Sequence, residues 1–188
     1  RMAAYLGYGF VGLYMEDTIQ VEEEPYFGYM RGALTCEELK EADAYAEIFG
    51  IELRPFIQTL AHLNQIVRYE EYQKIIDTDD ILLAEDPRTK TLLEHLIRTV
   101  SKNFSSKKIN IGMDEAHMVG LGKYLDRHGY RNRQEIMQRH LEMVLSICKQ
   151  YGFTVQMWSD MFFRLAFHGA YYENDVEKAK ALILEVVS

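Results

Sequence analysis

The fold is decided by residues 132–158, NRQEIMQRHLEMVLSICKQYGFTVQMW, which indicate a helix, a glycine stop and a strand. Apolar residues recur over residues 136–148 at spacings of three and four, the period of one helix face, which we expect to be buried. The members of that face are Ile136, Met137, Leu141, Val144, Leu145 and Cys148. Asn132 is a residue type that caps helix N-termini, and Gly152 can take the left-handed conformation that ends a helix. Residues 153–158 are then expected to form a short strand.

The same unit occurs a second time, over residues 35–57. Thr35 and Glu38 form a capping box, in which each side chain satisfies a backbone N–H near the other residue. One apolar face follows, Gly50 ends the helix, and residues 51–57 are expected to form a strand. The members of that face are Leu39, Ala42, Tyr45, Ala46 and Phe49.

Partial copies of the unit occupy the rest of the chain. Residues 1–6 are expected to form the end of a helix that leads into a strand over residues 10–15. Asp86-Pro87 begins a helix with an inward apolar face and leads into a strand near Ile109. A last helix is expected over residues 174–187.

Helices that alternate with strands predict the α/β class with a parallel sheet. A closed (β/α)8 TIM barrel needs roughly 250 residues, and this chain offers 188 residues and four predicted strands. We therefore expect residues 1–188 to be a single segment of a catalytic barrel, about half of it, that is incomplete at both ends.

Composition excludes some classes of protein and leaves others open. The formal net charge is -8, and no stretch concentrates Lys and Arg, which argues against a nucleic-acid partner. No apolar run approaches the length of a membrane span, so no membrane association is expected. Cys36 and Cys148 are far apart without metal-ligand spacing, and we expect both to be reduced packing residues. The chain begins with Arg1, so localisation stays open between the cytoplasm and the cell surface or exterior.

Polar residues gather where each predicted strand ends. In barrels of this class the functional groups lie at the carboxyl ends of the strands, and the opposite strand ends here carry only turn residues and a lysine. One site along one rim is the expected arrangement. In chain order the strands end in Tyr14, Glu16 and Asp17; in Gln58 and His62; in Asp114, Glu115 and His117; and in Trp158, Ser159 and Asp160.

The most informative of these residues are the adjacent carboxylates Asp114 and Glu115, which directly follow the apolar stretch Ile109–Met113. Neighbouring negative charges repel, which favours keeping one carboxyl group protonated, as a general acid must be. A solvated turn after a strand is the alternative that the dipeptide alone leaves open. Reading Asp114, Glu115 and His117 as metal ligands is the less favoured interpretation, because no second cluster with matching spacing appears.

Three stretches carry a resemblance to a known family. The sequence NIGMDEA of residues 110–116 resembles the Asp-Glu signature of family 20 glycoside hydrolases, the β-N-acetylhexosaminidases. Residues 49–62, FGIELRPFIQTLAH, resemble the third barrel strand of that family with its histidine-bearing loop. Residues 157–161, MWSDM, resemble the strand after the catalytic pair in a bacterial-type branch. The resemblance covers nearly the whole chain and corresponds to barrel strands two to five.

The resemblance implies substrate-assisted, retaining hydrolysis without an enzyme nucleophile. Glu115 would protonate the leaving oxygen and then activate water. Asp114 would accept the acetamido N–H of the sugar and stabilise the cationic intermediate. The implied ligand is a terminal β-linked GlcNAc or GalNAc of an oligosaccharide or glycoconjugate, and no cofactor or metal is implied.

Each of the other candidate site residues has two possible roles, one functional and one structural. His62 resembles the active-site loop histidine of the family, or it satisfies backbone groups of its loop. Trp158 would form a wall of the sugar pocket, or it fills the core. Asp17 resembles an acidic residue near the sugar, and Asp160 could hydrogen-bond behind the acidic pair, although both could cap local structure. Tyr14 is expected to pack inside the barrel.

The sequence leaves two further functional hypotheses open. One is another barrel glycosidase with a carboxylate nucleophile, which requires a second carboxylate about 5 Å from Glu115. The other is a half-barrel that folds by self-association through its open sheet edges. For the hexosaminidase that the resemblance implies, we expect the isolated 188-residue segment to be inactive, because the family's pocket also uses an arginine from the first strand and aromatic and acidic groups from the last strands.

Overall fold

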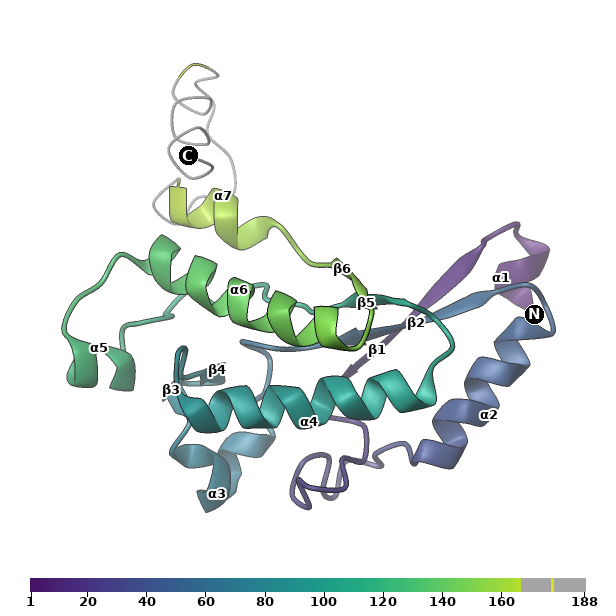
Figure 1. The fold of residues 1–188 in the computed structure, drawn as a ribbon, viewed down its shortest axis with the longest axis horizontal. Helices are drawn as coiled ribbons and strands as arrows, with labels where there is room; N and C mark the ends of the chain where they lie inside the picture. The colour runs from purple at the N-terminus through teal and green to yellow at the C-terminus, as the bar shows by residue number, and fades with distance from the viewer. Residues whose placement is uncertain (167–176, 178–188) are drawn as a thin grey trace.

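The computed structural model describes residues 1–166 and residue 177. Its centre is a four-stranded parallel sheet whose spatial order, β1-β2-β5-β6, follows the order of the strands along the chain (Figure 1). Such an order is that of consecutive strands in an α/β barrel. The strands are β1 (Phe10–Glu16), β2 (Glu52–Ile57), β5 (Lys108–Asn110) and β6 (Thr154–Gln156).

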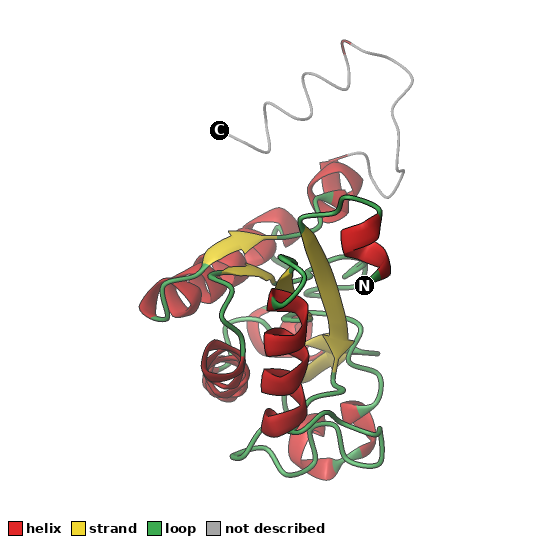
Figure 2. Cartoon of the chain, turned by 90° about the vertical axis from the view of Figure 1, so that its right-hand side faces the viewer, coloured by secondary structure: helices red, strands yellow, loops and turns green. Residues whose placement is uncertain are grey.

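The long helices lie together on one side of this sheet (Figures 1 and 2). α4 contacts both α2 and α6, while α2 packs on β2 and α6 packs on β6. The predicted fold class is therefore confirmed: a parallel sheet alternates with helices, as in part of an α/β barrel. The helices are α1 (Met2–Tyr5), α2 (Cys36–Glu47), α3 (Glu70–Gln73), α4 (Pro87–Asn103), α5 (Lys123–His128), α6 (Arg133–Gln150), α7 (Asp160–Ala166) and the 3₁₀ helix η1 (Ile66–Arg68).

The helix starts are those predicted from the capping residues. Asp86 accepts the N–H of Arg88 at 2.8 Å, and Asn132 accepts the N–H of Gln134 at 2.9 Å. Thr35 and Glu38 form the reciprocal capping box. Each cap satisfies a backbone donor that the first helical turn leaves without a partner.

The core lies between the helices and one face of the sheet. The inward face of α4 is fully buried there, as its spacing predicted. Side chains alternate along each strand, so the opposite sheet face carries Phe10, Tyr14 and Phe56, and Trp158 contacts Phe56 from the end of β6. Phe10, Tyr14 and Trp158 are 42–48% exposed. In a closed barrel this face is the interior.

Some predicted core positions are wrong. Tyr45 of α2 and Leu145 of α6 are exposed, and Leu39 is the one buried residue of α2. In the described part of the chain α2 packs mainly on β2 and α4, and the guanidinium of Arg1 lies 5.9 Å from the centroid of the Tyr45 ring. The predicted strand over residues 153–158 is also shorter in the structure, where β6 ends at Gln156.

An inserted hairpin between β2 and α4 was not predicted. β3 (Ile76–Thr78) and β4 (Ile81–Leu82) pair antiparallel beside α3 and η1, and they are too short to show a strand period in the sequence. The helix expected over residues 174–187 lies, Glu177 apart, outside the described residues. Both cysteines are free, as expected. In the part of the chain that the structure describes, every helix is too short or too polar to cross a bilayer.

Candidate active site

The acidic loop after β5 begins with a change in backbone conformation. β5 ends at Asn110, and Gly112, Met113 and Glu115 then adopt left-handed conformations with φ of 71°, 69° and 53°. A regular strand would send Asp114 and Glu115 to opposite faces of the sheet. The left-handed residues break that alternation, so the two adjacent carboxylates reach the same histidine. Non-glycine residues in this region cost free energy and gather at functional sites.

Gly112 is required at its position for two reasons. Its φ of 71° favours glycine, and a Cβ there would lie 2.1 Å from Oε1 of Gln58 and 2.8 Å from the carbonyl oxygen of Ile57. The Gly112 N–H is held by Oδ1 of Asn110 at 2.8 Å. The turn that presents the acidic pair is therefore built from β2 and β5 together.

Asp114 is held on both carboxylate oxygens. Gln58 Nε2 donates to Oδ1 at 2.8 Å, and Nε2 of His62 lies 3.2 Å from Oδ2. The approach of His62 is at ion-pair distance without hydrogen-bond alignment. The Asp114 side chain is 23% exposed, so it faces the rim with part of its surface open to a ligand.

Glu115 is the more accessible member of the pair. Its side chain is 51% exposed, and Oε2 lies 3.8 Å from Nε2 of His62. The backbone N–H of Glu115 donates to Oδ2 of Asp160 at 3.1 Å, which links the acidic loop to the start of α7. The loop is thus fixed at its backbone while the carboxyl group can meet a ligand.

His62 enters the site from the loop after β2. Its φ is 59°, and its N–H donates to Oδ2 of Asp80 in the turn of the β3–β4 hairpin at 3.1 Å. The hairpin therefore supports the loop that carries the histidine. Three strand ends, those of β2, β5 and β6, supply the residues that meet here.

His117 belongs to a neighbouring contact. Nη1 of Arg164 lies 2.8 Å from Nε2 of His117, and burial, followed by the charge of Arg164, lowers the pKa of the imidazole. A neutral imidazole can accept from the guanidinium at Nε2. Over residues 1–166 and 177, no three side chains of the metal-binding types come together as a site.

The other predicted site residues are placed differently. The backbone N–H of Trp158 donates to the carbonyl of Gly112 at 3.2 Å. The Trp158 ring contacts the Phe56 ring edge-on, with centroids 6.1 Å apart. Trp158 therefore lies beside the acidic loop at the edge of the open sheet face.

Asp17 is buried, and its Oδ1 is bound by Nε of Arg31 at 3.2 Å. Within the described residues, the contacts of Asp17 join it to Arg31 and not to the acidic pair.

Sequence reasoning noted Gln58 at a strand end without giving it a role, and it assigned Tyr14 to packing. Gln58 is fully buried and donates to the hydroxyl of Tyr14 at 3.2 Å. Tyr14 is half-exposed in this segment, on the sheet face that would be the interior of a closed barrel, and partial burial is the main cause that raises its pKa. An amide at the end of a strand predicted to be buried indicates that some hydrogen-bond partner is present, because buried polar groups need partners, but it does not identify Tyr14 or Asp114 as that partner.

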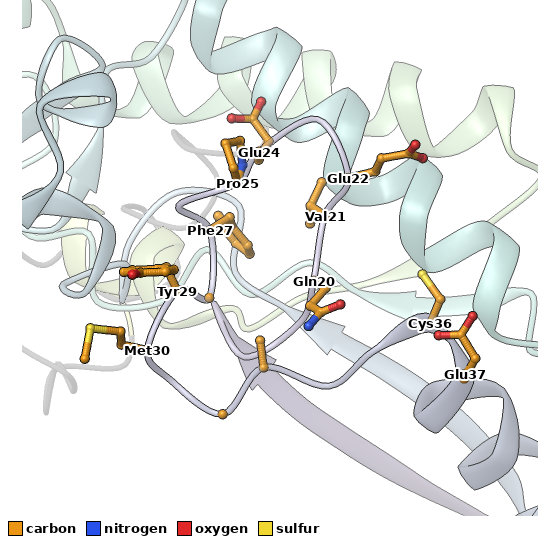
Figure 3. A pocket seen from close by; sticks show the side chains of 13 residues that line it. Gln20, Val21, Glu22, Glu24, Pro25, Phe27, Tyr29, Met30, Cys36 and Glu37 are labelled. Carbon is orange, nitrogen blue, oxygen red and sulfur yellow. The ribbon is translucent and has the colours of Figure 1, made fainter.

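A separate hollow lies inside the loop between β1 and α2, with a volume of about 650 Å³ (Figure 3). Its walls include Phe27 and Cys36 and none of the residues of the acidic loop. Glu24 also lines it, but its carboxylate is bound by Arg88 at 2.8 Å and by His95 at 2.8 Å.

These features define part of an α/β barrel whose carboxylates and histidine converge at the carboxyl ends of parallel strands, where barrel enzymes carry their functional groups. No protein-family model and no curated protein matches the chain. Solved structures do match. The fold is similar to the GH20 exo-β-N-acetylglucosaminidase of Vibrio harveyi in complex with N-acetylglucosamine, with a TM-score of 0.71 and 14% identity over 92% of this chain and 33% of that one.

Two Streptomyces enzymes give the same picture. The GH20 β-N-acetylhexosaminidase of Streptomyces coelicolor A3(2) has a TM-score of 0.70 at 16% identity, over 98% of this chain and 41% of that one. A mutant Streptomyces plicatus β-hexosaminidase in complex with product GlcNAc has a TM-score of 0.71 at 18% identity, over 98% and 40%. The likeness is one of fold, and at that level the predicted resemblance of the chain to GH20 enzymes is confirmed. The chain spans between a third and two fifths of the length of these enzymes.

Proposed function

We propose that this chain is the acid-bearing segment of a retaining exo-β-N-acetylhexosaminidase with a (β/α)8 barrel. The observation that carries the proposal is the convergence of Asp114 Oδ2 and Glu115 Oε2 on Nε2 of His62, at 3.2 and 3.8 Å. The substrate is a terminal β-linked GlcNAc or GalNAc, and the enzyme is a glycoside hydrolase of family 20.

Glu115 is proposed as the general acid and base. It protonates the leaving oxygen in the first step and accepts a proton from water in the second. Two features support this assignment: the carboxyl group of Glu115 is half-exposed, and its backbone N–H donates to Oδ2 of Asp160. The proton donor can thus reach a glycosidic oxygen without a change in the loop.

Asp114 is proposed as the residue that holds the 2-acetamido group. One oxygen of its carboxylate is occupied by Gln58, which leaves Oδ2, beside His62, to accept the acetamido N–H of the sugar. The acetamido oxygen then attacks the anomeric carbon, and the ring that closes carries positive charge. A carboxylate held beside that charge stabilises it.

Trp158 is proposed as a wall of the sugar pocket. Trp158 is 43% exposed and its backbone N–H is bound to Gly112, and a flat apolar ring suits the face of a sugar or its acetamido methyl group. Asp160 is proposed to position Glu115 by accepting its backbone N–H. Asp17, bound to Arg31, is proposed to shape the neighbouring loop rather than to contact the sugar.

The proposed pocket is shared with barrel strands beyond this segment. β1 and β6 are the edges of the described sheet, and the face that would be the barrel interior carries exposed aromatic rings. The isolated chain is therefore proposed to be inactive on an aryl N-acetyl-β-glucosaminide, and robust hydrolysis by it would contradict this. The open edges also favour self-association of the isolated segment, which a concentration series in sedimentation would detect.

One experiment separates the proposed mechanism from a glycosidase with a carboxylate nucleophile. A thiazoline mimic of the oxazoline intermediate should inhibit the complete barrel competitively. If a 2-fluoro glycoside instead trapped a covalent sugar on a carboxylate and the thiazoline had no effect, the substrate-assisted mechanism would be wrong.

A further inference from the structure

Gln58 is a buried amide whose polar atoms are all engaged at the centre of the site. Nε2 donates to Oδ1 of Asp114 at 2.8 Å and to the hydroxyl oxygen of Tyr14 at 3.2 Å. Oε1 accepts the N–H of Met113 at 3.3 Å. The residue follows β2 directly, and its partners belong to β1 and to the loop after β5, so one side chain ties three strand ends together.

We propose that Gln58 is the positioning residue of the acidic loop: it ties Oδ1 of Asp114 and the Met113 backbone, and so directs Oδ2 toward the acetamido N–H of the substrate. This inference rests on the proposed function and adds to it a residue that acts through Asp114. Gln58 itself is fully buried and so is not expected to touch the substrate.

The chemistry of the position requires an amide. Asp114 Oδ1 needs a donor, and the Met113 N–H needs an acceptor; a glutamine has both at its two ends. A glutamate of the same size has no donor when ionised, and would place a second negative charge at hydrogen-bond distance from Asp114. A buried unpaired charge or a lost partner is costly in such a site.

The backbone around Gln58 has adapted to it. Met113 is left-handed with φ of 69°, and the hydrogen bond to Oε1 supports that conformation. Gly112 leaves the space that the amide occupies, since a Cβ there would lie 2.1 Å from Oε1. The surrounding loop therefore accommodates a long side chain with an amide at residue 58. An apolar side chain that only filled the core would not need the hydrogen bond to Met113.

The test compares two variants in the complete barrel. Gln58→Met keeps the volume and removes every hydrogen bond; kcat on an aryl N-acetyl-β-glucosaminide should fall about 10- to 100-fold, with a smaller change in KM. Gln58→Glu should be active at low pH, where a proton shared with Asp114 restores the donor. Its kcat should fall with rising pH, from a lower pH than in the parent.

Thr59→Val is the matched control. Thr59 is the next residue, is equally buried, and its Oγ1 donates to the carbonyl of Ile111 at 2.8 Å without touching Asp114. The control should lose stability and keep the pH profile and kcat of the parent. A parent-like pH profile for Gln58→Glu, or equal losses of kcat in Gln58→Met and Thr59→Val, would overturn the inference.

A second readout keeps the inference separate from the proposed function. If the parent barrel does not cleave the glycoside, the proposed function fails, and the role of Gln58 is read from the protein alone. Hydrogen exchange at the Met113 N–H should then be faster in Gln58→Met than in Thr59→Val after correction for global stability. Equal protection in the two variants would show that Gln58 only packs.

Discussion

His62 Nε2 lies 3.2 Å from Oδ2 of Asp114, and this relationship joins the loop after β2 to the loop after β5. His62 itself has a φ of 59° and is fixed by Asp80 of the inserted hairpin. The histidine is therefore placed by one part of the chain against a carboxylate presented by another. Its geometry limits how Asp114 can turn.

His62→Asn is predicted to lower kcat of the complete barrel about 10- to 100-fold, with little effect on stability. Asparagine tolerates the left-handed backbone of residue 62, but its side chain is too short to reach Asp114. The measurement is steady-state kinetics together with thermal unfolding. His128→Asn, on the exposed side of α5, is the control, and a similar loss of kcat in both variants would refute the role of His62.

Gly112→Ala is predicted to destabilise the chain more than Gly152→Ala. Both glycines are left-handed, with φ of 71° and 73°, so both variants lose about 1–2 kcal/mol for the conformation of a non-glycine residue. Gly152 has nothing within 4 Å of the added Cβ, whereas at Gly112 the Cβ would overlap Gln58. Urea unfolding should give the larger loss for Gly112→Ala, and equal losses would contradict the close approach of Gln58.

Arg88→Met is predicted to cost about 3–5 kcal/mol of unfolding free energy, because it leaves the buried carboxylate of Glu24 without its main charge partner. Arg88 donates to Glu24 through both terminal nitrogens, at 2.8 and 2.5 Å, and Glu24 is 1% exposed. The matched control on the same helix is Arg98→Met, which removes an exposed pair with Glu23 and should cost less than about 1 kcal/mol. Similar costs in the two variants would show that burial of Glu24 does not govern the energy.

His140 is predicted to make the chain less stable in mild acid. Burial lowers the pKa of this imidazole to about 4 from its ordinary 6.5, and its Nε2 donates to the carbonyl of Thr59 at 2.8 Å. Between these two values the unfolded chain binds a proton that the folded chain does not, so stability is lost as the pH falls below 6.5.

From pH 7.5 to pH 5, this effect amounts to about 2 kcal/mol. Denaturant unfolding of the parent and of His140→Gln at both pH values measures it, because glutamine can still donate to Thr59 but does not titrate. The parent should lose about 2 kcal/mol more than the variant over this interval. An equal loss in both proteins would mean that other groups are responsible.

The sequence predicted the repeated unit because helix caps and glycine stops are local chemistry: Asp86, Asn132 and the Thr35–Glu38 box occupy the positions where the helices begin. It did not predict the β3–β4 hairpin, whose strands are shorter than any recognisable period. Tyr45 and Leu145 were wrongly placed in the core, because an apolar stripe shows only that a face can be buried and not what covers it.

The same division applies to the site. Polar residues at strand ends predicted that Asp114, Glu115, His62 and Asp160 would gather, since parallel strands end at a common rim. The role of Gln58 depends on its hydrogen bonds to Tyr14, 44 residues earlier in the chain, and to Asp114, 56 residues later. No local sequence pattern reveals contacts over such separations. Asp17 follows β1 at the same end of the sheet, but Arg31 binds its carboxylate, and that pairing also required the three-dimensional structure.

The most direct test of the central claim is the rate of Glu115→Gln in the complete barrel on two N-acetyl-β-glucosaminides that differ in leaving group. We predict that cleavage of the substrate with the poor leaving group falls by at least about 1000-fold, while cleavage of the one with an activated aryl group, which needs little protonation, falls much less. Asp114→Asn should slow both substrates alike, since it acts on the acetamido group. A Glu115→Gln enzyme that cleaves the poor leaving group at the parental rate would contradict the account.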